Sequence, residues 1–326
     1  MFRLPSNRPP ERFYRGGARI TELRGDPPAA EREPEDWVGS TTTIFGEREL
    51  GLTRLPDGRL LRDAVESDPV AWLGAEHVAR WGSDVRLLVK LLDAGQRLPV
   101  HAHPDDAFAA QHLGAAHGKA EAWCILEGGT VHLGLREDIG MPQLADLVAR
   151  QDTGALLALL HEIEVSPGDV VWVPPGELHA IGAGVLLLEL QQPEDLSILL
   201  EWDGFAIDGA AAGHLGLGFE VALGAVNRAG RTSEGVSALM RRAAGAGTLL
   251  PDAAEEYFRL ERVAVASEVA LDAGFAVILV VDGELVVGGL PGARGATFVA
   301  AANETVSAIG HGELLVARPP NAAAQP

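Results

Sequence analysis

Four side chains of the metal-binding type stand out in the middle of the chain. His101 and His103 are separated by one residue, and Glu121 and His179 follow further along. Because side chains of a strand alternate between its two faces, both imidazoles of a His-x-His pair point the same way. Three imidazoles and one carboxylate are a suitable ligand set for a divalent metal. We therefore predict that these four residues bind one metal ion.

Glycine and proline residues punctuate the chain around these ligands, as expected where strands end in tight turns. The punctuating residues are Gly95 and Gly128 in the first segment and Gly168, Pro174 and Gly176 in the second. The two spacings resemble the paired motifs of the cupin superfamily. This resemblance implies a small antiparallel β-barrel with three histidines and one glutamate around a metal ion.

The surrounding sequence predicts a mainly β protein with short helical insertions. Apolar runs of strand length, each closed by Gly or Pro, fill residues 85–135 and 165–192, whereas residues 137–164 and 68–81 have helical periodicity. We expect an N-terminal segment and a metal-binding cupin domain, a double-stranded β-helix or jelly-roll barrel, in residues 1–203. A helical linker is expected in residues 204–250 and a second cupin domain in residues 251–326.

The second cupin is predicted to be degenerate. DGELVVGG and RGATFVAAANETVSAIG near the C-terminus echo EGGTVHLG and PGDVVWVPPGELHAIG in the first half, so an internal duplication is expected. In this echo Ser307 occupies the place of His179, so the second copy lacks that metal ligand. Its expected role is structural, in covering the site or in dimerisation.

A narrower resemblance involves three motifs of the first half. HPDD at 103–106, GKAEAW at 118–123 and PPGELHA at 174–180 are similar to the zinc-site motifs of the type I mannose-6-phosphate isomerase family. The likeness extends over roughly residues 85–195. It implies an aldose–ketose isomerase that interconverts mannose 6-phosphate and fructose 6-phosphate. In this resemblance Lys90 corresponds to a lysine of the family, and Glu189 corresponds to the first residue of the family's E-x-Q-x-x-x-D pattern.

Three further residues are candidates for the chemistry. Lys90 interrupts an apolar run, and since an ammonium is rarely buried without a role we expect it to face the site. Lys119 precedes Glu121 by two residues and would share its face of a strand, where it could attract an anionic part of the substrate; a solvated loop lysine is the alternative. Glu189 is the candidate acid/base, with a structural ion pair as the alternative.

The chain departs from the family pattern at three positions. His101 stands where the family usually has glutamine, which keeps a metal ligand at that place. Pro99 replaces a serine implicated in holding phosphate, and it offers neither a hydroxyl nor an N–H group. Leu199 stands where the family's catalytic arginine is expected, so another cation must take over, or the substrate is different, or the isomerase chemistry has been lost.

Our main hypothesis is therefore a metal-dependent aldose–ketose isomerase with mannose 6-phosphate or an altered sugar as substrate. Glu189 and Lys119 would be catalytic, Lys90 and Lys119 would bind substrate, and Zn(II) would be the metal. Fe(II) or Mn(II) suits the same ligands, so an oxygen-using oxidoreductase is one alternative. A non-catalytic sugar-binding cupin is another.

Composition limits the classes of molecule that the protein is expected to bind. The formal net charge of −20 disfavours nucleic acid and anionic membranes, which leaves a small-molecule sugar or sugar phosphate. Cys124 is the single cysteine, so no internal disulfide can form, which fits a reducing compartment. We expect its thiol to be a small buried side chain. The N-terminal residues show no apolar signal region, and a cytoplasmic location is expected. Composition leaves the oligomeric state open.

Overall fold

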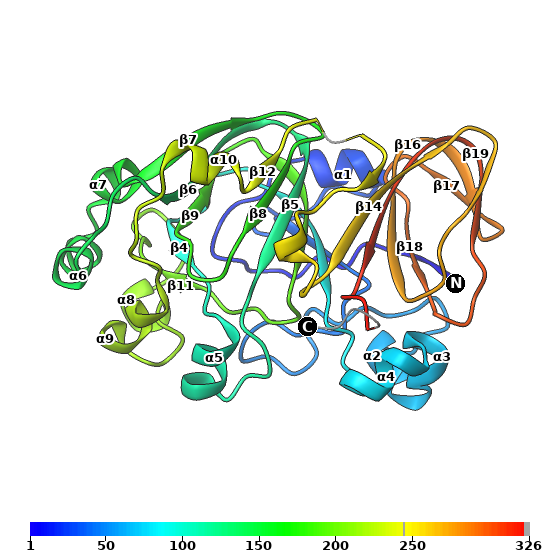
Figure 1. The fold of residues 1–326 in the computed structure, drawn as a ribbon, viewed down its shortest axis with the longest axis horizontal. Coiled ribbons are helices and arrows are strands. Elements are labelled where there is room, and N and C mark those ends of the chain that lie inside the picture. Colours follow the sequence, from blue (N-terminus) through cyan, green and yellow to red (C-terminus); the bar gives the residue numbers. More distant parts are fainter. Residues whose placement is uncertain (244, 323–326) are drawn as a thin grey trace.

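The computed structural model describes residues 1–243 and 245–322. Antiparallel sheets form its body and short helices lie around them (Figure 1), which confirms the mainly β prediction. Among the described residues, no helix has the length and apolar character needed to span a membrane.

Two antiparallel sheets make up the first barrel. The six-stranded sheet has the order β12 (Met240–Arg241), β8 (Val170–Val173), β5 (Glu121–Glu127), β10 (Leu186–Gln191), β3 (Leu88–Asp93) and β2 (Glu35–Val38). The five-stranded sheet has the order β11 (Ile198–Leu199), β4 (His101–Ala102), β9 (His179–Ile181), β6 (Gly129–Leu135) and β7 (Leu160–Val165). The predicted metal ligands thus come from both sheets.

Strand register decides which side chains face the site. In β10, Glu189 lies opposite Lys90 of β3 on one side and Trp123 of β5 on the other. Directly paired residues of neighbouring strands share a face of the sheet. All side chains of β10 and β3 are buried, so this sheet carries charged groups into an otherwise apolar interior. Cys124 of β5 is also buried, as predicted.

A separate antiparallel sheet has eight strands, seven from the C-terminal part of the chain and one, β1 (Phe2–Leu4), from its N-terminus. Its main path runs through β1, β18 (Thr297–Ala300), β16 (Ala276–Val287), β19 (Ser307–Arg318), β14 (Arg259–Val265) and β13 (Gly247–Thr248), and β15 (Glu268–Ala270) and β17 (Leu290–Ala293) pair off this path. Along β16, Val277 and Leu279 join the core of the first barrel, whereas Ile278 and Val280 belong to a separate core. The alternation of strand side chains therefore lets one strand pack on both sides.

Helices lie at the periphery of the two barrels. In the predicted insertion, α6 (Met141–Arg150) and α7 (Thr153–Ala158) project at the end of the first barrel that is remote from the second sheet (Figure 1), and β7 begins directly after them. The helix expected over 68–81 is divided at Gly74, whose φ of 88° does not continue a helix. The other helices are α1 (Arg19–Arg24), α2 (Leu61–Ser67), α3 (Pro69–Leu73), α4 (Ala75–Trp81), α5 (Asp106–Phe108), η1 (Ala109–Leu113), α8 (Gly209–Ala212), α9 (Phe219–Ala222), η2 (Leu223–Ala225), α10 (Ser233–Ser237) and η3 (Asp252–Ala254).

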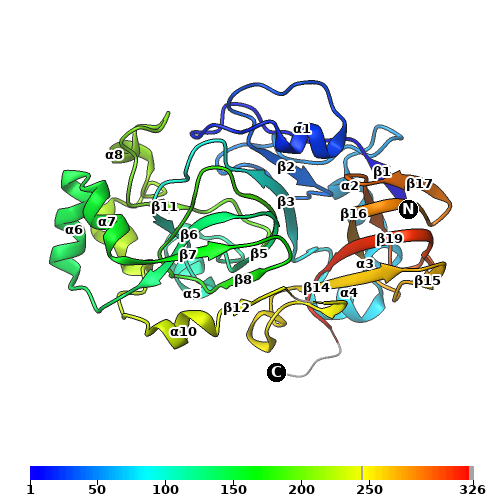
Figure 2. The same cartoon turned by 90° about the horizontal axis from the view of Figure 1, so that it is seen from above.

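The two ends of the chain meet in the second sheet. β1 pairs with β18, with Phe2 opposite Val299, and the chain then crosses over the first barrel before α1 and β2 (Figure 2). The N-terminal residues therefore contribute to both barrels. The predicted division at residues 203 and 250 stays a prediction, and the interval between these positions contains α8, α9, η2 and α10.

Candidate metal centre and active site

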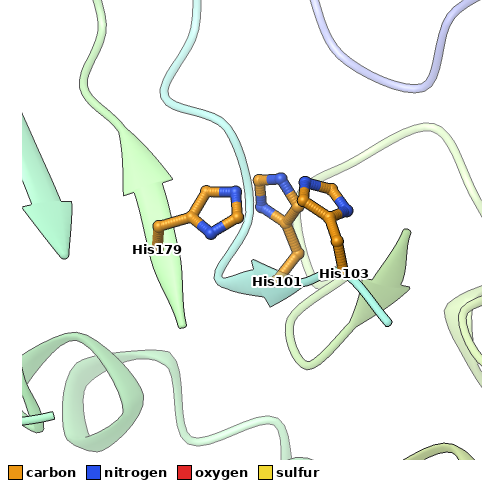
Figure 3. A group of neighbouring side chains, drawn as sticks. All are labelled: His101, His103 and His179. Atoms are coloured by element: carbon orange, nitrogen blue, oxygen red, sulfur yellow. The ribbon is translucent and has the colours of Figure 1, made fainter. Parts of the chain in front are cut away.

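The three predicted histidines converge between the sheets of the first barrel (Figure 3). His101 of β4 lies directly opposite His179 of β9, and His103 follows β4. A ligand nitrogen of each ring lies within 4.8 Å of the others, and all three residues are buried. This cluster could hold one metal ion.

Backbone carbonyls fix the orientation of the three rings. Each imidazole has its Nδ1 within hydrogen-bond distance of a carbonyl oxygen, so Nδ1 carries the proton and the lone pair is on Nε2. The acceptors for His101, His103 and His179 are Pro99 at 2.8 Å, Leu196 at 2.6 Å and Glu177 at 2.8 Å. The rings are thereby held in the tautomer that binds a metal through Nε2.

Burial keeps the imidazoles of His101 and His103 uncharged. It lowers the pKa of His101 well below its usual value, helped by the neighbouring His179. Burial and the charge of Lys119 lower the pKa of His103 to about 3. Neutral imidazole is the form that coordinates a metal.

Glu121 completes the predicted ligand set. Its Oε2 lies 3.0 Å from Nε2 of His103, and its Oε1 lies 3.2 Å from Nε2 of His179 and accepts a 3.0 Å hydrogen bond from Trp123. Burial alone would raise the pKa of Glu121, but Lys119 and the histidines outweigh it, so the pKa is well below its usual range. Oε2 of Glu121 and Nε2 of His179 are buried without a well-formed hydrogen bond. Two such atoms side by side are the groups that a divalent metal would satisfy.

The loops that carry the ligands are joined by hydrogen bonds from backbone N–H groups, one to a side-chain carboxylate and one to a backbone carbonyl. Gly118 donates to Asp106 at 2.8 Å, and a Cβ at this glycine would lie 2.4 Å from the carbonyl oxygen of Pro104. Only glycine fits this close approach. Gly176, at a φ of 83°, donates to the carbonyl oxygen of His103 at 2.7 Å. The HPDD, GKAEAW and PPGELHA motifs are therefore parts of one assembly.

Lys119 faces the site, so the solvated alternative is wrong. Its side chain is buried, and Nζ lies 2.9 Å from Oε2 of Glu121 and 3.5 Å from Oε1 of Glu189. Burial would lower the pKa of Lys119, but these two carboxylates raise it above its usual value. The side chain is therefore a fixed positive charge beside the ligands.

Glu189 lies next to the metal ligands and is buried. Its Oε2 is 4.0 Å from Nζ of Lys90, and its Oε1 contacts Lys119. Burial, together with the charge of Glu121, raises the pKa of Glu189 to about 8. A carboxyl group with a raised pKa in a cavity suits proton transfer, and its assignment as the acid/base stays a prediction.

Lys90 also points into the interior. Nζ lies 3.9 Å from Glu35, 4.0 Å from Asp195 and 4.7 Å from the centre of the Trp37 ring. The ammonium is thus held by carboxylates and by an aromatic face.

The sequence analysis missed three residues from the N-terminal segment. Arg12, Tyr14 and Glu35 line the same cavity as His101 and Lys119. The signal that could have found the last of them is the Glu35-x-Trp37 alternation on a short strand, because Trp37 donates to Glu35 at 2.6 Å. The positions of Arg12 and Tyr14 depend on contacts distant in sequence.

Arg12 is the guanidinium that the structure brings to this cavity. Its two terminal nitrogens each lie 3.2 Å from an oxygen of Asp195, and Nε lies 3.5 Å from Glu35. Burial would raise the pKa of Asp195, but Arg12 and Lys90 lower it far below its usual range. Leu199 is buried on β11, directly opposite His101 of β4, but it is not among the residues that line the cavity.

The cavity beside the ligands is small, at about 30 Å³. This is room for one or two water molecules. Arg12, Phe13 and Tyr14 form part of its wall. A sugar can therefore enter only if some of these walls move.

Comparison with known proteins agrees with this picture. No family model matches the chain. It is 38% identical to the mannose-6-phosphate isomerase of Streptococcus mutans over 134 residues, which are 39% of this chain and 41% of the other. With a mannose-6-phosphate isomerase of Bacillus subtilis it shares 37% identity over 122 residues, 36% of this chain and 38% of the other. The matches thus span about two fifths of the length of these curated relatives.

Solved structures extend the likeness to nearly the whole fold. Mannose 6-phosphate isomerase from Bacillus subtilis superposes with a TM-score of 0.73 at 22% identity, covering 97% of this chain and 98% of the other. A single-residue variant of phosphomannose isomerase from Salmonella typhimurium gives 0.76 at 17% identity, covering 98% of this chain and all of the other. These likenesses confirm the predicted cupin architecture. The chain is therefore similar to mannose-6-phosphate isomerases in sequence over about two fifths of its length and in fold over almost all of it.

Proposed function

We propose that the protein is a metal-dependent aldose–ketose isomerase of the mannose-6-phosphate isomerase kind. The observation that carries this proposal is the placement of a buried carboxyl group, Glu189, beside three histidines that all present Nε2 to one point. The similar proteins of Streptococcus mutans and Bacillus subtilis bear the name of this activity. The substrate is a small sugar or sugar phosphate.

His101, His103, Glu121 and His179 would hold the metal, with Zn(II) as the ion that best fits three imidazoles and a carboxylate. When bound, the metal would stabilise negative charge on the sugar oxygens. In its ionised form Glu189 takes the proton from C2 of the aldose and returns it to C1, while a proton passes from O2 to O1, so that an enediol forms and collapses to the ketose. Lys119, whose ammonium contacts both Glu121 and Glu189, holds the base in place.

The proposal also covers the rest of the chain. Residues 251–326 would be a degenerate cupin with a structural role, because Ser307 occupies the place of His179 in the echo between the two sequence halves. The single cysteine is buried and unpaired, which suits the reducing cytoplasm as the compartment.

Two measurements test the proposal. Proton NMR of the zinc-loaded protein with mannose 6-phosphate and with mannose, in deuterated water, should show ketose and loss of the C2 proton signal. Metal analysis should give about one ion per chain for the native protein and much less for His179→Ala, with the exposed His311→Ala as the matched control. Absence of exchange with both sugars in metal-loaded protein would refute the isomerase.

A further inference from the structure

One part of the wall of the small cavity is held differently from the rest. The lining residues outside the 12–14 segment all lie on a strand or within three residues of one. Strands are tied to their neighbours by ladders of hydrogen bonds, so they do not move singly. Residues 11–17, here called the strap, belong to the N-terminal chain that crosses over the first barrel (Figure 2). The strap is therefore the part of the wall that is free to move without disrupting a sheet.

The inner side of the strap is fastened by polar contacts at the cavity. Each terminal nitrogen of Arg12 lies 3.2 Å from an oxygen of Asp195, and its Nε lies 3.5 Å from Glu35. The hydroxyl group of Tyr14 donates a hydrogen bond to Glu35. These contacts act as a latch between the strap and the barrel.

Release of this latch would leave no buried carboxylate without a partner. Asp195 keeps Lys90 as a cationic neighbour at 4.0 Å, and Glu35 keeps the same lysine at 3.9 Å. Glu35 also keeps its 2.6 Å hydrogen bond from the indole of Trp37. An isolated buried charge is what makes the breaking of an ion pair costly, so the retained partners lower the cost of opening.

The outer side of the strap is held by hydrogen bonds of the backbone. Gln96 donates to the carbonyl oxygen of Arg15 at 3.1 Å, and Ala206 donates to that of Phe13 at 2.9 Å. Arg15 and Ala206 are exposed. Near the surface such groups exchange a protein partner for water at little net cost.

Two features of the closed strap oppose its position. Glu11, at the beginning of the strap, has a φ of 58°, a conformation that residues other than glycine, asparagine and aspartate rarely adopt. The Nε group of Arg12 is buried without a well-formed hydrogen bond. Opening relieves both, so the closed and open states are closer in free energy than the latch alone would make them.

From these observations we infer that the strap is a gate, which opens to admit the sugar and then closes so that Arg12 and Tyr14 complete the wall of the cavity. Closure would keep bulk water away from the enediol. The inference rests on the proposed function for the reaction that the gate encloses, whereas the movement itself does not depend on it.

A reversible lock tests the gate. Arg15→Cys with Gln96→Cys places a disulfide across the backbone hydrogen bond between these residues, and the buried Cys124 is not available to compete. Oxidation should reduce turnover of mannose 6-phosphate and of mannose, and calorimetric binding of the non-isomerising mannitol, by about tenfold or more, and reduction should restore them. The control is Glu284→Cys with His311→Cys, an exposed pair directly opposite on β16 and β19, which should change neither.

A second variant should act in the opposite direction. A Cβ at Gly16 would lie 2.8 Å from the Cα of Pro34, which directly precedes β2, so Gly16→Ala should keep the strap from closing. The amide of Ala206, which bonds to Phe13 in the closed strap, should then exchange with deuterium about tenfold faster, as measured by NMR. Gly154→Ala, where a Cβ meets nothing within 4 Å, is the control and should leave this exchange unchanged.

The same exchange should slow in the oxidised lock. Because this measurement needs neither metal nor substrate, it decides the gate even where the reduced protein turns over neither sugar, a result that would refute the isomerase alone. Exchange that stays native in both folded variants, or native turnover and mannitol binding with the disulfide closed, would overturn the gate and leave the isomerase proposal standing.

Discussion

The ammonium nitrogen of Lys119 lies 3.0 Å from Nε2 of His103, so a fixed positive charge touches one of the atoms that we expect to bind the metal. The same ammonium contacts Glu121. The metal ion and the ammonium group would therefore share two neighbours, and each positive charge must weaken the binding of the other to them.

Replacing this lysine should separate metal binding from turnover. In Lys119→Met the competing charge is lost, and metal affinity should rise by about tenfold, measured by competition with a chromophoric chelator. Turnover should fall by about 100-fold or more, because Glu189 loses its close cationic neighbour. Weaker metal binding in this variant would show that Lys119 supports the ligands rather than competing with the ion.

Glu189→Gln should remove proton transfer while it leaves binding intact. The amide is nearly the same shape but cannot accept the C2 proton, so exchange with deuterium should slow by about 10²- to 10⁴-fold. Metal content and affinity for mannitol should be unchanged. The exposed Glu220→Gln is the control, and a Glu189→Gln enzyme with native exchange rates would require a different base.

Arg12→Lys tests the contribution of the N-terminal segment. A lysine cannot reproduce the two-point contact with Asp195, so the wall of the cavity should loosen. We expect KM to rise by about tenfold with a smaller change in kcat, measured at full metal occupancy. Native values of both constants would mean that Arg12 does not shape the productive cavity.

Asp169 should make stability depend on pH at a place away from the ligands. Burial would raise its pKa, but hydrogen bonds from the backbone N–H groups of Ala243 and Ser166, both 2.9 Å, and from Arg242 lower it below 3.8. A lowered carboxyl pKa contributes stability at neutral pH that disappears as the pH falls through the folded-state value. Asp169→Asn should therefore unfold more easily by about 1–2 kcal/mol at pH 7, and this difference should shrink towards about pH 3.

Urea unfolding of the metal-free protein at the two pH values measures this effect without interference from metal binding. Asp203→Asn should unfold like the native protein at both pH values. A difference for Asp169→Asn that persists in acid would show that the effect is steric.

The sequence predicted those parts of the site that local rules control. His101 and His103 share a face because strand side chains alternate, and the glycine at 176 bends the loop that presents His179. The placement of Lys119 in the cavity followed from the same alternation relative to Glu121. Each of these inferences needs only neighbours within a few residues.

What the sequence did not reveal depends on contacts between distant segments. Arg12 and Asp195 are 183 residues apart, and no periodic pattern around Arg12 distinguishes it from the other arginines of the chain. The pairing of β1 with β18 is likewise a contact between the two ends of the chain. The division of the 68–81 helix came from the backbone angle of one glycine, which helical periodicity does not encode.

Lys90 and Lys119 are the only lysines in the sequence, and both are buried in the cavity. Apart from the α-amino group, every exposed basic side chain is therefore a guanidinium or an imidazole. Open-chain sugars form Schiff bases with free amines, and a buried, charged amine is a poor nucleophile. A protein built in this way presents its own sugar substrates with almost no surface amine for non-enzymatic glycation.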